Sequence, residues 1–362
     1  MVYKQQWQTS AKLDPVMSIT LKDLGEVEPD STLGKQWDRL VQSNPASGFM
    51  QSTHWAQFKR QMGLKPYHLA LLADDELFGG GIFYAAPNMK GAGFLVAPDG
   101  PVLPWHNDEL AARGMELLVE SLAAEASTSG SMALRIAPRL GAQLPPALQE
   151  FSRSPLRLIE NKTMFLDLRP EPEILLEKMK PKARYNIGLA RRKGVTVHEE
   201  SSLSAARKFY AVMQSVAARN EIFVEPLSYF IALIDTLCAP GLARVLFAEH
   251  DGEILGALIM VIFGERATYL YGGTTDTKRN FMGGYALQWA AIETARKAGA
   301  KTYDFWGYDS ASSPDNNYAG FSRFKSQFCG ECIELSGALD LYFMDRLADV
   351  VIKAINEMAL ET

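Results

Sequence analysis

The order of apolar and polar residues is the same in two stretches of the chain. Residues 67–98 contain three apolar or alternating segments, a helical segment follows at 107–126, and an apolar segment closes the unit at 131–138. Residues 243–308 repeat this order, and the second strands even resemble each other, ELFGGGI against EILGALI. Runs of this kind predict strands, whereas three-and-four spacing predicts a helix. The pattern therefore predicts a duplicated unit of three strands, a helix and a fourth strand.

The helical segment of the second unit has the clearest period. One apolar face is formed at three-and-four spacing by Tyr285, Trp289, Ile292 and Ala295. Three meandering strands, a helix and one more strand make up the mixed sheet of acetyltransferase-like (GNAT) proteins. We therefore expect an α/β fold with two GNAT-like domains in tandem.

Composition narrows the class of protein. A chain of 362 residues exceeds what one hydrophobic core usually supports, which favours two domains. The formal charge of −5 argues against binding of nucleic acid over the whole surface, but it is compatible with local basic patches. No apolar run is long enough for a membrane span and the first ten residues are no signal peptide, so we expect a cytoplasmic protein.

Motifs of several enzyme classes are missing from the sequence. There is no phosphate loop, dinucleotide fingerprint, H-E-x-x-H or G-x-S-x-G, and the five histidines lack metal spacing. Hydrolase, kinase and metalloenzyme functions therefore have no support, and we expect no metal site. Cys329 and Cys332 form a C-x-x-C, but a strand or turn follows it instead of a helix, and no second pair completes a zinc site. Their role stays open.

A basic segment precedes the second unit. From Lys178 to Lys193 the chain has seven basic residues and no acidic one. Pro181 can begin a helix there, because its missing N–H costs nothing in the first turn. The cations are either a solvated face or a binding site for phosphate groups, for which the candidates are Lys182, Arg184, Arg191 and Arg192.

A second cationic feature lies near the end of the chain, in the stretch AGFSRFKSQFCGE. We interpret this stretch as strand-like, with Lys325 between Phe324 and Phe328. Lys325 is then either a surface lysine flanked by core phenylalanines or a cation held in place to meet a negative group.

The stretch KRNFMGGYAL stands where simple acetyltransferases have a Q/R-x-x-G-x-G/A turn. That turn holds the pyrophosphate of coenzyme A at a helix N-terminus. Met282 occupies the position that requires glycine after Arg279. The departure weakens an acyl-CoA interpretation without removing it.

Seven segments follow one another along the chain: SGFMQSTHWAQFKRQMG, GPV at 100–102, KPKARYNIGLARRKGV, AARNEIFVEPLSYF, YLYGGTT, YDFWGY and GFSRFKSQFCGECIELSGALDL. Together they resemble the Fem family (FemA, FemB and FemX), non-ribosomal transferases that build the side-chain bridges of peptidoglycan. The helical arm that some members carry is missing. The resemblance implies two GNAT-like domains, residues 1–160 with 338–362 and residues 161–337, with a last helix at 345–360 returning to the first domain.

The resemblance also implies a reaction. An amino acid would pass from aminoacyl-tRNA to a free amine on the stem peptide of UDP-MurNAc-pentapeptide or lipid II. Lipid II would bring the protein to the inner face of the membrane. No cofactor is implied, because the tRNA ester is already activated, and we expect a monomer. Which amino acid is transferred, and how many, stays open.

By resemblance, the catalytic residues are Lys325 and Phe324. Aminolysis of an ester passes through a tetrahedral oxyanion, which a fixed cation stabilises. Lys325 would serve as that cation near the transferred acyl group, and Phe324 would shape its surroundings. Tyr269 and Tyr271 are expected on one face of a strand, either lining the cleft or packing in the core.

The acceptor carries a diphosphate, and its binding requires cations. By resemblance, these are Lys59 or Arg60 from the first domain and Arg219 from the second, across a cleft between the domains. Phe223 replaces the family's tyrosine four residues after that arginine, which removes a hydroxyl group. Trp105 is a further candidate for contacting the nucleotide or sugar.

Two other functions remain compatible with these residues. An acyl-CoA-dependent N-acyltransferase could use the same fold, and tight binding of CoA without binding of aminoacyl-tRNA would favour it. A non-catalytic protein that binds RNA or a nucleotide sugar is the second alternative. In that case Lys325→Ala would leave ligand affinity unchanged.

Overall fold

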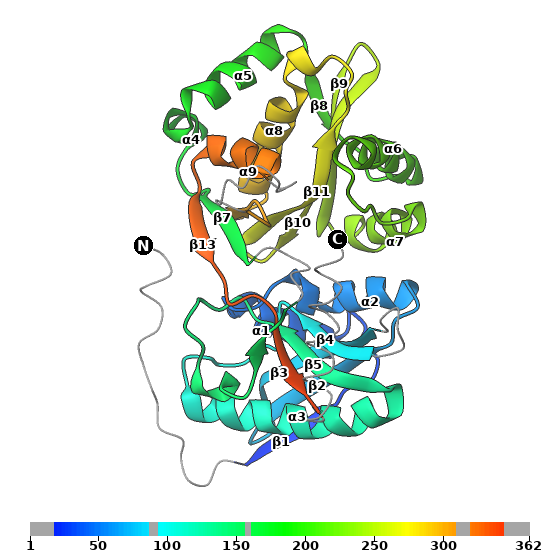
Figure 1. Ribbon diagram of the computed structural model, residues 1–362, viewed down its shortest axis with the longest axis vertical. Coiled ribbons are helices and arrows are strands. Elements are labelled where there is room, and N and C mark those ends of the chain that lie inside the picture. The colour runs from blue at the N-terminus through cyan, green and yellow to red at the C-terminus, as the bar shows by residue number, and fades with distance from the viewer. Residues whose placement is uncertain (1–17, 87–92, 156–160, 309–318, 344–362) are drawn as a thin grey trace. The chain divides into compact units, whose positions relative to one another are not determined.

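Two seven-stranded mixed sheets organise the protein, each with its own core (Figure 1). The computed structural model describes residues 18–86, 93–155, 161–308 and 319–343. It separates a first unit, Met1–Asn161 with Leu335–Thr362, from a second unit, Lys162–Glu334. The predicted α/β tandem is confirmed, whereas the predicted helix at 345–360 lies outside the described residues.

In the first unit, one long helix covers one face of the sheet and two shorter helices cover the other. The strands follow the order β1 (Ile19–Asp23), β2 (Pro66–Ala73), β3 (Glu76–Ala86), β4 (Gly93–Pro98), β5 (Ser131–Ala137), β14 (Leu339–Tyr342) and β6 (Ser152–Arg153). Helix α3 (Asp108–Ser129) packs its apolar side against one face. The other face carries α1 (Thr32–Ser43), the 3-10 turn η2 (Phe49–Gln51) and α2 (Thr53–Gln61) (Figure 1). A second 3-10 turn, η3 (Pro146–Leu148), contacts α3.

The second unit repeats this plan with more helices. Its strand order is β13 (Glu331–Glu334), β7 (Lys162–Asp167), β12 (Thr302–Asp304), β11 (Arg266–Thr274), β10 (Glu253–Phe263), β9 (Ala243–His250) and β8 (Thr196–Glu199). One face packs against α4 (Pro172–Lys178), α5 (Pro181–Arg192) and α8 (Gly283–Lys297). The other carries α6 (Leu203–Asn220) and α7 (Leu227–Cys238) (Figure 1). Short helical turns follow at η4 (Arg279–Phe281), α9 (Ala319–Lys325) and η5 (Ser326–Phe328).

Both units use the same local devices to set strand register. The turn between β2 and β3 has Asp74 and Asp75 in the left-handed region, with φ of 46° and 68°, and the turn between β9 and β10 has Asp251 and Gly252, with φ of 51° and 75°. Two-residue turns with positive φ match the twist of a hairpin. Pro181 begins α5, as predicted.

The two units differ where their parallel strands meet. Strand β4 pairs with β5 along its whole length, from Gly93 to Pro98. Strand β11 pairs with β12 only from Arg266 to Thr268, and its remaining residues have no partner on that side among the named strands. Among the described residues, no strand therefore lies beside the second half of β11 on that side.

Candidate active site

A cavity of about 360 Å³ lies in the second unit, along the unpaired half of β11. Its wall is formed by the end of α6, by β11, by the turn before α8 and by the start of α8 and α9. Arg219, Tyr269, Gly284, Tyr285 and Phe324 are among its lining residues. All of its lining residues that the structure describes belong to the second unit.

Two glycines bring the first turn of α8 into the cavity wall. A Cβ on Gly283 would lie 2.7 Å from Cβ of Leu255, and a Cβ on Gly284 would lie 2.9 Å from Cγ2 of Thr274. Met282 precedes them with φ of 60°, in the left-handed conformation that glycine usually supplies. The backbone N–H groups and the positive dipole end of α8 therefore adjoin the cavity, which is suited to an anionic group. The departure from the coenzyme A turn hid this anion site in the sequence, although the two consecutive glycines, Gly283 and Gly284, indicated it.

The cations at the cavity mouth are held by carboxylates. Arg219 donates from Nη1 to the carbonyl of Thr274 at 3.0 Å and to Oδ1 of Asp276 at 2.9 Å. Asp276 also lies 3.6 Å from Nη1 of Arg279, and Lys278 is paired with Glu253. The structure thus places Arg219 at this cavity. Its partner Asp276 is 57 residues away in sequence and was not foreseen.

The prediction that Lys325 sits on a strand is wrong. Residues 319–325 form α9, and 326–328 form a 3-10 turn. Phe321, Phe324 and Phe328 have helical spacing, and Phe324 and Phe328 contact each other with ring centroids 5.3 Å apart. Phe324 also meets the ring of Tyr285 at 5.1 Å. This aromatic packing, which a helix allows, fixes the segment beside α8.

Lys325 is buried, with 8% of its surface exposed. Its Nζ donates to the carbonyl oxygen of Gly307 at 2.6 Å and lies 5.6 Å from the centroid of the Tyr269 ring. Tyr269 and Phe324 line the cavity, whereas Lys325 is not part of its lining. The ammonium group therefore stands next to the cavity wall, in contact with the ring that forms it.

Burial lowers the pKa of Lys325 to about 8, and the carboxylate of Asp304 acts in the opposite direction. Asp304 is itself fully buried. It accepts hydrogen bonds from the backbone N–H of Trp306 at 2.9 Å and from the hydroxyl of Thr163. The site thus contains a lysine whose proton is held less tightly than usual, with a buried carboxylate nearby.

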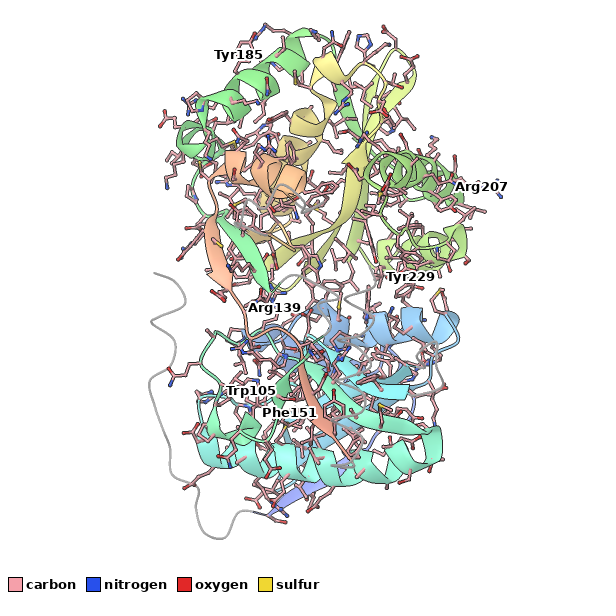
Figure 2. The ribbon with its side chains drawn as sticks, in the orientation of Figure 1. Trp105, Arg139, Phe151, Tyr185, Arg207 and Tyr229 are labelled. Carbon is pink, nitrogen blue, oxygen red and sulfur yellow. The ribbon has the colours of Figure 1, made fainter. Side chains whose placement is uncertain are left out.

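The prediction that Tyr269 and Tyr271 share one strand face is also wrong. Tyr271 pairs with Ile259 and Tyr269 with Met260, so Leu270 is an extra residue in β11, a β-bulge. Tyr269 consequently packs with the core under α8. Tyr271 points to the other face, where its hydroxyl lies 3.0 Å from that of Tyr229 on α7 (Figure 2). Only Tyr269 lines the cavity.

The remaining predicted acceptor residues lie elsewhere. Phe223 follows α6 and is 81% exposed. Trp105 is buried in the core beneath α3 (Figure 2), and its Nε1 has no hydrogen-bond partner among the described residues. The structure thus places Trp105 in the core of the first unit and not on its surface.

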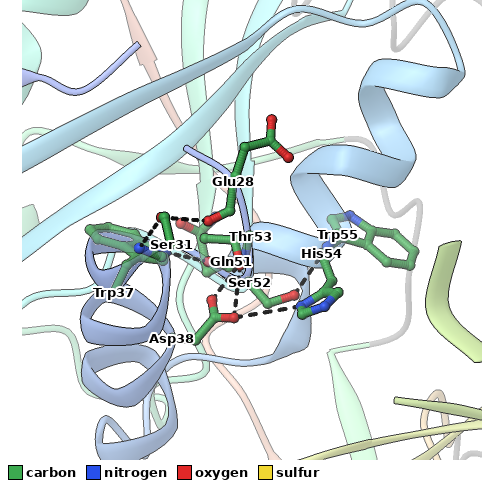
Figure 3. Close-up of polar contacts among 10 residues, drawn as sticks. Glu28, Ser31, Trp37, Asp38, Gln51, Ser52, Thr53, His54 and Trp55 are labelled. Carbon is green, nitrogen blue, oxygen red and sulfur yellow. Dashed lines mark hydrogen bonds and ion pairs between the residues drawn. The ribbon is translucent and has the colours of Figure 1, made fainter. Parts of the chain in front are cut away.

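Lys59 and Arg60 lie in the last turn of α2. The start of this helix is fixed by Ser52, whose side chain accepts from the N–H of Trp55, and by Asp38, which binds Thr53 (Figure 3). Nζ of Lys59 lies 5.1 Å from the Trp55 ring centroid. Arg60 faces two carboxylates, those of Glu26 and Glu28, in the loop between β1 and α1. The two neighbouring cations therefore have different surroundings, aromatic for Lys59 and acidic for Arg60.

The basic segment lies on α5. Arg184 donates to the carbonyls of Glu177 and Met179 and so caps the end of α4. Lys182, Arg191 and Arg192 are exposed. Arg184 is thus tied to the backbone, whereas the other three cations face solvent.

The described residues lack two features that other functions would require. They contain no group of three or more His, Cys, Asp or Glu side chains arranged to hold a metal ion. Within the same ranges, none of the helices has the length and apolar character needed to cross a membrane. Cys329 and Cys332 are both exposed as free thiols.

Comparison with known proteins gives consistent matches over most of the chain. The model of the FemAB family matches residues 33–165, 160–253 and 241–352. The lipid II:glycine glycyltransferase of Staphylococcus saprophyticus is 22% identical over 379 residues, covering 84% of this chain and 90% of that protein. The UDP-N-acetylmuramoylpentapeptide-lysine N(6)-alanyltransferase of Weissella viridescens is 29% identical over 157 residues, 43% of this chain and 46% of that one. The crystal structure of FemX superposes with a TM-score of 0.78 at 19% identity, covering 88% of this chain and 98% of that structure.

Proposed function

The chain belongs to the FemAB family, and we propose that it transfers an amino acid from aminoacyl-tRNA to the stem-peptide amine of a peptidoglycan precursor. The names of two relatives support this: one acts on lipid II and transfers glycine, and the other acts on UDP-N-acetylmuramoylpentapeptide and transfers alanine. Both are aminoacyltransferases. The precursor is one of these two forms, and we place the reaction in the cytoplasm, with a monomeric enzyme and no cofactor.

The observation that carries the proposal is the cavity beside β11, with a helix N-terminus and a buried lysine against its wall. In the reaction, the acceptor nitrogen bonds to the ester carbon, the ester C–O bond breaks, and a proton passes from the amine to the departing ribose oxygen. A tetrahedral oxyanion forms on the way, and preorganised positive charge stabilises it. The ester is reactive enough for an amine to attack it without a covalent enzyme intermediate.

Each part of the cavity has a role in this proposal. The first turn of α8 binds a phosphate of the tRNA end. Arg219, which the resemblance assigns to the acceptor's diphosphate, lines the same cavity, and we propose instead that it binds this tRNA phosphate. Tyr269 and Phe324 contact the aminoacyl group. Lys325 contributes its positive charge from behind the Tyr269 ring, in surroundings of low dielectric, where such a charge acts strongly.

The acceptor residues remain proposals as well. Lys59, in the last turn of α2, is our candidate for the diphosphate in the first unit, and its neighbour Arg60 faces two carboxylates. Phe223 offers an exposed ring.

The test is transfer of a labelled amino acid from a charged-tRNA mixture onto UDP-MurNAc-pentapeptide and, separately, onto lipid II. Lys325→Met should lower kcat, by up to about the 10²-fold that loss of a direct oxyanion donor costs. Lys301→Met, which removes an exposed lysine paired with Glu265, is the matched control and should keep full activity. Absence of transfer onto both acceptors, combined with acylation from acyl-CoA, would replace the proposal with an N-acyltransferase function.

A further inference from the structure

Helix α5 joins two segments that border the cavity. At its start, the N–H of Lys180 donates to the carbonyl of Gln327 at 3.0 Å, two residues after Lys325. At its end, Nζ of Lys193 donates to the carbonyl of Asn280 at 2.9 Å, in the turn before α8. Its own residues Ala183, Asn186 and Ala190 are buried. The helix is therefore held firmly, and its outer side is a fixed surface.

That outer side combines an exposed aromatic ring with cations. Tyr185 is 62% exposed, and the guanidinium carbon of Arg192 lies 5.8 Å from its ring centroid. Gly188 stands between them on the helix, and a Cβ there would approach Nη1 of Arg192 to 3.2 Å. Because Gly188 has no side chain, the guanidinium group of Arg192 can pack over it towards the Tyr185 ring. Lys182 is one turn before Tyr185 on the same stripe, by the helical period.

Several other cations of the second unit have carboxylate partners. Lys208, Arg244 and Lys301 each lie within salt-bridge distance of a carboxylate. Within the described ranges, Lys182 and Arg192 have no such carboxylate partner in the structure, and α5 itself contains no acidic residue. A group of cations that the protein does not neutralise is suited to a polyanion.

We propose that the α5 face, defined as Lys182, Tyr185 and Arg192, binds the acceptor end of tRNA, with Tyr185 stacked on a base and the two cations on phosphates. The RNA identity rests on the proposed function. Aromatic rings interleaved with cations are the usual means of binding unpaired nucleotides. A helix that lies on a lipid surface needs an exposed apolar face, whereas Ala183, Ile187 and Ala190 of α5 are turned towards the core.

The first experiment measures binding of 5′-fluorescein-labelled, deacylated tRNA by anisotropy. Tyr185→Ala should weaken binding by about 5- to 100-fold, and Tyr185→Phe should retain it, because stacking needs only the ring. The exposed side chain of Tyr185 can be truncated without opening a cavity in the core. Arg207→Ala is the matched control, since it removes an exposed cation on α6 of the same unit (Figure 2). A change of less than twofold in Tyr185→Ala, or an equal loss in Arg207→Ala, would overturn the proposal.

The salt dependence of binding tests the two cations. The double variant Lys182→Ala, Arg192→Ala should reduce the slope of log K against log salt by about 1.5, as expected for two lost phosphate contacts. Vesicles containing phosphatidylglycerol form the other arm. A double variant that loses vesicle binding but retains the tRNA affinity and slope of the wild type would assign the α5 face to lipid, and the proposal would fail.

Steady-state transfer separates this proposal from the proposed function. If both hold, Tyr185→Ala raises KM for aminoacyl-tRNA and leaves kcat unchanged. Wild-type transfer with an unaltered KM in Tyr185→Ala would overturn the α5 proposal alone. The wild type could instead bind tRNA in a way that depends on Tyr185 but transfer no amino acid. That result would support the α5 proposal and contradict the proposed transferase function.

Discussion

The buried ammonium group of Lys325 should make folding stability depend on pH in a direction opposite to that of a salt-bridged lysine. Its pKa falls from 10.5 to about 8 in the folded protein because burial disfavours the charged form. The unfolded chain then binds the proton more tightly than the folded chain, and below pH 8 this costs stability. As pH rises from 8 towards 10.5 the cost disappears, so this group makes the protein more stable at higher pH.

The magnitude follows from the shift. At about 1.36 kcal/mol per pKa unit, a difference of about 2.5 units costs ~3.3 kcal/mol at pH 7 and ~0.8 kcal/mol at pH 10. The contribution of Lys325 should therefore change by ~2.5 kcal/mol over this range. Lys325→Met keeps the length of the side chain and removes the titrating group, so the difference between wild type and variant isolates the effect from all other titrating residues.

Urea unfolding of wild type and Lys325→Met at pH 7, 8, 9 and 10 provides the measurement. The free energy of unfolding of the wild type, minus that of the variant, should rise steadily with pH. Lys301→Met serves as the control for loss of one lysine from the surface. A difference that stays constant within about 0.5 kcal/mol between pH 7 and pH 10 would show that Lys325 has no depressed pKa, since the expected change is about five times larger.

Three further outcomes are expected. If the ammonium form of Lys325 is the active one, kcat should fall as pH rises through about 8, and a stopped assay over pH 6.5–9.5 checks this. Gln51→Ala should destabilise the first unit by ~2–4 kcal/mol in urea unfolding, because the Gln51 amide bonds both backbone groups of Ile82 and would leave them unpaired. Asp340→Ala should cost ~3–5 kcal/mol, since the buried, two-pronged pair with Arg135 would leave a guanidinium without its carboxylate, and Asp340→Asn should recover part of the loss.

The duplicated plan could be predicted because burial imposes a visible period on the sequence. Residues 76–86 and 253–263 show the same apolar run, and the turns before them have residues that tolerate positive φ. Both strands lie inside their sheets, with a neighbouring strand on each side, and the long helices that follow have one apolar side. At these positions the apolar pattern of the sequence matches the burial in the folded protein, so the pattern was sufficient to predict the strands and helices.

Two features of the site were not predicted correctly in this way. Phe324 and Phe328 are four residues apart, a spacing that places both on one face of a strand and also of a helix. Phe321 favours the helix that the structure shows, because residues three apart share a face in a helix but not in a strand. The bulge at Leu270 is hidden because β11 is covered on both faces, so its sequence lacks the alternation that would reveal an extra residue. A single inserted residue then sends Tyr269 and Tyr271 to opposite sides.

Because β11 and β12 pair over only a few residues, backbone amides of β11 can report whether a ligand occupies the cavity. Backbone amides of β11 that point towards β10 are bonded along the strand. Beyond Thr268, those that point the other way have no strand partner in the part of the chain that the structure describes. In hydrogen–deuterium exchange, alternate amides from Tyr269 to Thr274 should exchange quickly in the empty enzyme and slow when a ligand fills the cavity. The corresponding amides of β4, paired along the whole strand, should show no such response. Exchange along these two strands would therefore show which half of the duplicated fold receives the donor, without a catalytic assay.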